Sequence, residues 1–265
     1  MKHIVKSALM LAAMLMLVAN ASAVSIPDFS VGKWSYNILS EEEKTVEVNT
    51  YTNGMADLVG HVAIPGNVTY GGTVYTVTSI GESAFFNCRK ITSVDIPESV
   101  TSIGEKAFCY CSELSSIIIP DNVTSICRHA FAMCTGLTSI NLPEGLTSIS
   151  EHVFDGCSSL TSIKIPYSVT SIGEYAFSNC SGLTSVELPD GLVSIGNDAF
   201  YYCSGLTSIE LPDGLMSIGD RAFAGCSGLT SVVIPDGVMS LGIAAFRDCS
   251  ALSILTIGRG LTSLN

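Results

Sequence analysis

The chain has 265 residues, of which 47% are hydrophobic, and this is enough to build a substantial core. It carries 24 acidic and 12 basic residues, which gives a net charge of −12 at pH 7. A surface of this sign repels phosphate backbones, and the composition therefore argues against nucleic acid as a partner.

The first 23 residues have the pattern of a secretory signal peptide. Met1–Lys6 is a short basic segment, Ser7–Ala19 is an apolar run, and Ala21-Ser22-Ala23 fits the small-residue cleavage pattern. The apolar run is shorter than the about 20 residues that a membrane span needs. We expect cleavage near Ala23 and a secreted or cell-surface location, with an uncleaved N-terminal anchor as the alternative. Cleavage leaves 10 basic and 24 acidic residues, a net charge of −14.

Residues 24–77 are predicted to form an N-terminal β cap. Ser35–Leu39 and Thr45–Thr50 are strand-like and flank the acidic turn Glu41–Glu43. Val68–Tyr75 reads as strand, Gly-Gly turn and strand, which is the signal of a hairpin. We expect this hairpin to cover the open edge of the first coil, because a solenoid has to protect its end strands.

Residues 78–265 repeat with a period of 23. Phenylalanine keeps this step from Phe85 to Phe246, and proline keeps it from Pro97 to Pro235. Cysteine keeps it at Cys88, Cys111, Cys134, Cys157, Cys180, Cys203, Cys226 and Cys249. Because 23 residues cannot build a core alone, the copies must stack and bury their apolar side chains against one another. The sequence therefore predicts a solenoid of about eight coils.

Each repeat predicts two short strands and one corner. In the copy that begins near Leu206, the alternation in Ile209–Leu211 fits a strand with one buried face, and Pro212–Gly214 has turn chemistry. Leu215–Ile218 repeats the strand pattern, and Asp220–Phe223 is predicted to form a single helical turn. The predicted fold is thus mostly β, with short helical or 3-10 corners.

These repeats resemble the BspA-like leucine-rich repeats, a 23-residue class of bacterial and protist surface proteins. The resemblance lies in the Ile/Leu-Pro pair, the Thr-Ser-Ile-Gly run, Ala-Phe and the single Cys, from about Ile64 to the C-terminus. Trp34–Val48 is similar to the lead-in strands of such proteins. Cys127 and Ser150 depart from the pattern by replacing the glycine, and Gly258 replaces the last proline. The resemblance implies a leucine-rich-repeat solenoid and adhesion to host or neighbouring-cell ligands.

The eight periodic cysteines are predicted to be free thiols. Equivalent residues of adjacent coils stack about 4.8 Å apart with parallel side chains. Disulfides need Cβ atoms about 3.8 Å apart and converging bonds. The expectation is a column of buried thiols that act as small hydrophobes and weak donors. Cys109 and Cys127 break the period and lie on successive coils, so a disulfide between these two residues is a remaining alternative.

The motifs give no support for catalysis, a cofactor, a metal or a small-molecule substrate. His61, His129 and His152 have no metal-binding spacing, and no G-x-S-x-G elbow, P-loop or G-x-G-x-x-G is present. His129 and His152 occupy the same position of successive repeats and are interpreted as two solvated histidines that stack side by side. We expect a protein that is not an enzyme.

Candidate binding residues are those that vary on the outer side of the first strand. We call them the outward column: Asp95, Ile118, Asn141, Lys164, Glu187, Glu210, Val233 and Thr256. Beside a near-constant serine column they should form a flat face roughly 40 Å long, and solenoids bind macromolecules on such faces. The column lacks aromatic rings that would stack on sugars, while Ile118 and Val233 are isolated apolar points, so an extracellular or cell-surface protein is the expected ligand.

Two alternatives remain for this interpretation of the surface. The outward column could consist only of solvated strand positions, in which case the chain would be a passive stalk or coat component that contacts copies of itself. A second candidate binding surface is the corner that carries Tyr110, Met133, Tyr201 and Tyr202.

The sequence stops within a repeat, at Leu261–Asn265. An uncovered last coil would expose strand N–H and C=O groups, and such an edge invites pairing with another chain. The expectation is self-association through the C-terminal edge, or that the chain is a fragment of a longer array.

Overall fold

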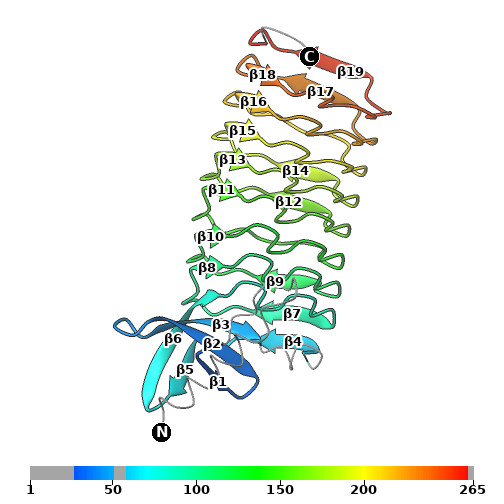
Figure 1. The fold of residues 1–265 in the computed structure, drawn as a ribbon. Coiled ribbons are helices and arrows are strands. Elements are labelled where there is room, and N and C mark those ends of the chain that lie inside the picture. The colour runs from blue at the N-terminus through cyan, green and yellow to red at the C-terminus, as the bar shows by residue number, and fades with distance from the viewer. Residues whose placement is uncertain (1–26, 51–57, 262–265) are drawn as a thin grey trace, which may run out of the picture.

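The computed structural model describes residues 27–50 and 58–261, and these form a β-solenoid of stacked coils (Figure 1). Two rows of short strands run along the stack, and the first coils are joined to an N-terminal group of longer strands. The predicted signal peptide, residues 1–23, and the last residues, 262–265, lie outside the described part. The predicted fold class, a leucine-rich-repeat solenoid with 23-residue coils, is confirmed.

The N-terminal group begins with an antiparallel meander. β1 (Phe29–Val31) pairs with β2 (Trp34–Ser40), and β2 pairs with β3 (Thr45–Thr50). β5 (Asn67–Tyr70) and β6 (Thr73–Ile80) form the predicted hairpin, whose turn residues Gly71 and Gly72 have φ values of 60° and 82°. Positive φ at both central residues is what a two-residue hairpin turn requires, and glycine adopts it without strain.

The hairpin does not close the edge of the first coil; β3 closes it. The first half of β6 pairs with β5, while its last residues, Ser79 and Ile80, enter the solenoid and pair with β8. The other edge of the same residues pairs in parallel with β3, where Val48 faces Ile80. The meander therefore satisfies the backbone groups that the end of β6 would otherwise expose, while β4 (Gly60–Ala63) is an edge strand of its own sheet.

The first strand row holds the predicted strand of most coils. Equivalent residues of neighbouring coils face each other in parallel pairs, which is the register that a fixed repeat length dictates. The row consists of β4 (Gly60–Ala63), β7 (Ile91–Asp95), β9 (Ser116–Ile118), β12 (Ser162–Lys164), β14 (Ser185–Glu187), β17 (Ser231–Ile234) and β19 (Ile254–Ile257).

The second row consists of two-residue strands that follow the proline turn. They are β8 (Ser102–Ile103), β10 (Ser125–Ile126), β11 (Ser148–Ile149), β13 (Ser171–Ile172), β15 (Ser194–Ile195), β16 (Ser217–Ile218) and β18 (Ser240–Leu241). The serine side chains face outward, and all but the last of the paired apolar residues are buried.

The glycine after each second strand is needed because the coils approach closely there. A Cβ on Gly104 would lie 2.7 Å from the carbonyl carbon of Gly81, a distance that real Cβ atoms do not show. The second row is interrupted between β10 and β11, and these are the two coils in which Cys127 and Ser150 replace this glycine. The Ser150 hydroxyl donates to the carbonyl of Ile126, a position that the glycine N–H occupies in other coils. The departure from the repeat therefore has a local structural consequence.

The predicted helical corners are wrong: among the described residues each corner is a series of tight turns. The N–H groups of Ser83 and Phe85 donate to the next coil, at Glu105 and Ala107 O, whereas the alternate N–H groups donate three residues back. A helix would direct every N–H back along its own axis. Two residues of each corner have positive φ, as Lys106 (55°) and Tyr110 (64°) do. The corner thus adds a third ladder of hydrogen bonds between coils.

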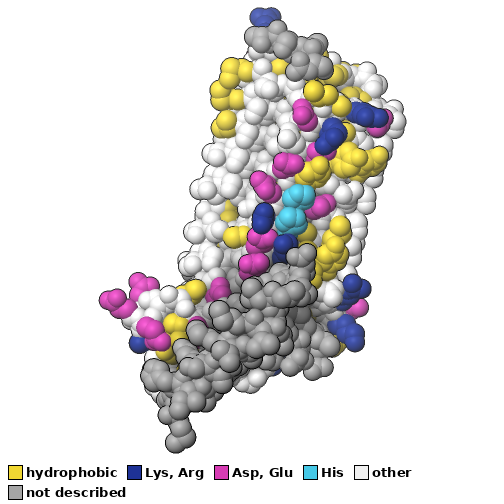
Figure 2. Space-filling view, in the orientation of Figure 1, with side chains coloured by type: hydrophobic (Ala, Val, Ile, Leu, Met, Phe, Trp, Pro, Cys, Tyr) yellow, Lys and Arg dark blue, Asp and Glu magenta, His cyan; other side chains and the backbone are white. Residues whose placement is uncertain are grey.

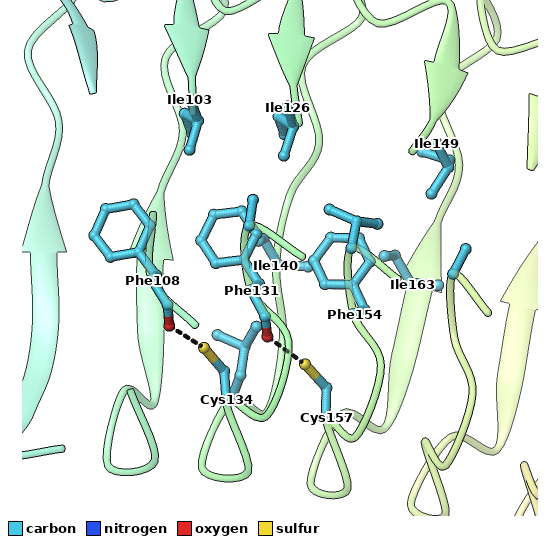
Figure 3. Close-up of a cluster of buried hydrophobic side chains, with 14 of the residues drawn as sticks. Ile103, Phe108, Ile126, Phe131, Cys134, Ile140, Ile149, Phe154, Cys157 and Ile163 are labelled. Atoms are coloured by element: carbon cyan, nitrogen blue, oxygen red, sulfur yellow. Dashed lines mark hydrogen bonds between the residues drawn. The ribbon is translucent and has the colours of Figure 1, made fainter. Parts of the chain in front are cut away.

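The core consists of columns of identical side chains. The phenylalanine rings from Phe85 to Phe246 stack nearly parallel, with adjacent centroids 4.9–5.7 Å apart. Beside them, Cys134 Sγ lies 3.1 Å from Phe108 O and Cys157 Sγ 3.2 Å from Phe131 O (Figure 3). All ten cysteines are free. The predicted column of free thiols is confirmed; seven of its eight members are buried and Cys249 is half-buried. Cys109 and Cys127 are not bonded to each other.

Candidate functional site

The structure places all eight residues of the outward column on the surface of the first strand row. Their side chains are exposed, because each follows an inward residue such as Val94, Ile117 or Ile163. In the register of the sheets, Asp95 faces Ile118, Lys164 faces Glu187 and Val233 faces Thr256. Neighbouring coils therefore present these side chains side by side, at the roughly 4.8 Å spacing of paired strands.

The face is not the continuous sheet that the repeat predicts. It is divided into three sheets, β4-β7-β9, β12-β14 and β17-β19, and the coils of Asn141 and Glu210 have no strand in this row. In both of these coils the residue before the proline is leucine, Leu142 or Leu211, where strand-forming coils mostly have a buried isoleucine. β-Branched residues fit a strand better than leucine does. Leu188 precedes the proline in the coil of β14, so the exchange by itself does not abolish the strand.

One of these interruptions lies beside a shallow hollow of about 210 Å³. Asn141, Leu142, Glu144, Lys164 and Pro166 line it. It is smaller than the roughly 300–1,000 Å³ of typical small-molecule sites. It brings an amide, a carboxylate and an ammonium group together at one point of the outward column.

Two charged residues of this face, Asp95 and Lys164, contact neighbouring side chains. Asp95 Oδ2 lies 3.2 Å from His61 Nε2, and His61 Nδ1 lies 2.9 Å from Ser93 Oγ. Lys164 Nζ lies 4.7 Å from the ring centre of Tyr167, a residue whose side chain is 69% exposed. Sequence reasoning missed His61 and Tyr167, since neither belongs to the variable position of the strand.

The predicted corner surface is present but is divided along the stack. Tyr110 packs edge-on against Phe86, and Tyr201 packs edge-on against Tyr202. A Cβ on Gly225 would lie 3.0 Å from the Tyr202 ring, and one on Gly156 would lie 2.5 Å from Met133 Sδ. The glycines thus make room for the large side chain of the preceding coil. These contacts give the aromatic residues a packing role within the solenoid.

The corners also carry a stripe of charged and histidine side chains (Figure 2). The predicted stacking of His129 on His152 is confirmed, with ring centroids 4.4 Å apart, and Tyr175 continues the stack at 4.7 Å. His129 Nδ1 is buried without a hydrogen-bond partner, so this half-buried ring is only partly solvated, which differs from the expectation. Its pKa is lowered, first by burial and then by the charge of His152.

The stack continues into an ion pair that the sequence did not reveal. Arg221 Nε and Nη2 donate to the two carboxylate oxygens of Asp198, both at 2.8 Å, and the Asp198 side chain is buried. These hydrogen bonds raise the pKa of Arg221. Burial raises the pKa of Tyr175, and the Asp198 charge adds to this effect. The signal available in the sequence was that Asp198 and Arg221 are 23 residues apart, which is one repeat length. Within residues 27–50 and 58–261 no three potential ligands gather into a metal site.

Comparison with known families identifies the repeats. The family model described as "BspA type Leucine rich repeat region" matches residues 67–183 and 171–265. This covers well over half of the chain. The chain belongs to the BspA-type leucine-rich-repeat family. No match was found among curated proteins.

Solved structures of similar proteins show the same fold. A leucine-rich repeat protein from Bacteroides ovatus is 36% identical, with a TM-score of 0.68 over 88% of this BspA-type chain and 70% of its own. A leucine rich cell surface protein from Faecalibacterium prausnitzii is 29% identical, with a TM-score of 0.56 over 91% and 79%. A leucine-rich repeat protein from T. pallidum is 26% identical, with a TM-score of 0.55 over 84% and 90%. No described segment of the present chain is a helix long and apolar enough to cross a bilayer.

Proposed function

We propose that this BspA-type chain is exported, is located outside the cell, and binds a protein partner through the outward column without catalysing a reaction. The observation that carries the proposal is the contrast within the first strand row. The inward residues are always apolar and a serine column is nearly constant, whereas the eight outward positions are exposed and differ in charge and polarity. Nothing in the packing of the coils requires that variety.

Export and surface location rest on the N-terminal pattern and on a relative. Residues 1–23 have the pattern of a signal peptide. The F. prausnitzii protein, which is similar over most of both chains, is described as a cell surface protein. A protein ligand is favoured because Ile118 and Val233 are 74% and 60% exposed beside charged neighbours, a mixture of apolar points and polar surroundings that protein interfaces share.

Charge reversal on the face tests the proposal. The variant Asp95→Lys, Glu187→Lys, Glu210→Lys should lose the partner that the wild-type mature chain captures from extracellular and cell-surface proteins. The control Glu42→Lys, Glu151→Lys, Glu174→Lys makes the same change in net charge away from this face and should retain the partner. Equal capture by both variants would exclude the outward column as the binding surface.

A passive coat or stalk component is the second candidate. Ile254, Leu255 and Ile257 of β19 are 60%, 41% and 41% exposed, and this apolar strand favours contact between copies. Static light scattering over a range of concentrations separates the two functions. A mass that grows with concentration, and returns to the monomer value in Ile254→Thr/Ile257→Thr, supports self-association.

A further inference from the structure

Near the C-terminal end of the second strand row, an apolar stripe takes the place of a column of threonines. The residue before each short strand is threonine in five coils, at Thr78, Thr101, Thr124, Thr147 and Thr170. The hydroxyls of Thr101, Thr124 and Thr170 donate to the backbone carbonyl of the equivalent threonine in the preceding coil, at 3.3–3.5 Å. In the next three coils the residues are Val193, Met216 and Met239, which we call the apolar stripe.

The apolar stripe lies outside the buried core. Val193, Met216 and Met239 are 40%, 44% and 56% exposed. Their backbones keep the register of the threonine coils, since Met216 N donates to Val193 O and Met239 N donates to Met216 O, both at 2.9 Å. Three successive coils thus replace a threonine with an apolar side chain that stays 40–56% exposed to water, and covering it would be favourable. Hydrophobic side chains gather over β15, β16 and β18 at the upper left of Figure 2.

An acidic column accompanies the stripe. Asp190, Asp213 and Asp236 come three residues earlier in the same coils and are exposed. Asp236 Oδ1 accepts a hydrogen bond from the backbone N–H of Arg259 at 2.8 Å. Among residues 27–50 and 58–261, no hydrogen bond or ion pair engages the carboxylates of Asp190 and Asp213. A partner that covers the apolar stripe therefore meets uncompensated negative charge at its border.

We propose that the apolar stripe binds an amphipathic helix of a partner protein, one that carries lysine or arginine beside its apolar residues. Three stacked coils span about 10 Å, which matches the roughly 10.5 Å rise between residues i and i+7 of a helix. Methionine side chains adapt to the shape of an incoming apolar face. Basic residues on the helix complement the Asp column, whereas a second copy of this acidic chain or an anionic membrane would be repelled.

The test uses the mature full chain and a labelled synthetic helix of about 18 residues (~27 Å) with leucine at i, i+3, i+4 and i+7 and lysine elsewhere. Fluorescence anisotropy measures its binding to wild type and to Val193→Thr/Met216→Thr/Met239→Thr. Threonine is the residue of the earlier coils, so the variant should fold. We expect its Kd to rise by about tenfold or more, as when a buried apolar anchor is lost. Asp190→Asn/Asp213→Asn should weaken binding and flatten its salt dependence.

Several results would overturn the proposal. These are an unchanged Kd in the threonine variant, equal binding of a peptide with glutamate in place of lysine, and no binding of the lysine peptide below about 1 mM. The proposal would also be overturned if the wild-type chain forms a dimer, or binds anionic vesicles, and the threonine variant abolishes that interaction. If the triple variant does not fold, Met216→Thr and Met239→Thr are measured singly. The Asp95→Lys, Glu187→Lys, Glu210→Lys variant should bind the peptide as wild type does, so this test stands apart from the proposed function.

Discussion

Cys180 Sγ lies 3.1 Å from the carbonyl oxygen of Phe154, which belongs to the preceding coil. The same carbonyl accepts the N–H of Cys157 at 3.1 Å, so one oxygen links two coils. The bond recurs in seven of the periodic cysteines, from Cys111 to Cys249, at 3.0–3.2 Å. The thiol column therefore fills space and satisfies a buried acceptor at once.

The first prediction concerns the reactivity of these thiols. Burial raises the pKa of Cys88 to about 11 and that of Cys226 to about 12, so little thiolate forms at pH 8. Titration with a thiol reagent should find almost no reaction of the periodic eight in native protein and at least eight thiols after denaturation without reductant. Mass spectrometry that finds four disulfides among the periodic cysteines would contradict the column.

The second prediction tests the ring column. Phe177 is fully buried and stacks on Phe154 and Phe200, with centroids 5.4 and 5.2 Å away. Phe177→Ala should lower the free energy of unfolding by about 3–5 kcal/mol, because it leaves a cavity between two coils. Denaturant unfolding measures this, with the exposed Tyr167→Ala as a control that should lose less than about 1 kcal/mol. A similar small loss for Phe177→Ala would mean that the corner is not packed as described.

The repeat made most of the fold predictable, because a fixed 23-residue step forces equivalent residues into columns. The ring stack, the free thiols and the Gly71-Gly72 hairpin followed from that step and from turn chemistry. The conformation of the corners could not be predicted in this way, since Ala-Phe with flanking polar residues also fits a helical turn. The decisive difference is positive φ at residues such as Tyr175 and Arg221, side chains that give no sign of a left-handed backbone.

The candidate site was only partly predictable for a related reason. Periodicity placed Lys164 and Glu187 next to each other, and the structure pairs them in register. It could not show that the coil of Asn141 lacks a strand, because the coil of Glu187 also has a leucine before its proline and forms one. Similarly, Asp198 and Arg221 occupy variable positions, and their opposite charges form an ion pair only because the coils stack them next to each other.

The third prediction concerns the glycine column. A Cβ on Gly196 would lie 2.8 Å from the backbone nitrogen of Glu174, so Gly196→Ala must push two coils apart. We expect a loss of about 1–3 kcal/mol, the range of overpacked positions. Gly191→Ala is the matched control, because the nearest atom to its Cβ, Tyr167 O, is 3.6 Å away. The control should be neutral or slightly stabilising through the unfolded state. Equal losses in thermal unfolding of the two variants would contradict the close approach.

The fourth prediction concerns acid. The folded-state pKa of His129 is lowered, first by burial and then by the charge of His152, with Lys106 and Arg128 acting in the same direction and Glu105 opposing them. The unfolded chain, with a histidine pKa of about 6.5, therefore binds the proton more readily than the folded chain does. Stability from this group is complete above about pH 6.5 and is lost as the pH falls through the lower folded pKa.

His129→Asn should therefore lose less stability than wild type between pH 7.5 and pH 5.0, as measured by denaturant unfolding at both values. Asparagine is chosen because His129 has a φ of 57° and asparagine tolerates this region better than most residues. His61→Asn, on the first strand row, removes a histidine away from the stack and serves as the control. It should retain the acid sensitivity of wild type. If His129→Asn retains it as well, the stacked and partly buried ring does not oppose protonation, and its orphaned Nδ1 must be satisfied in solution.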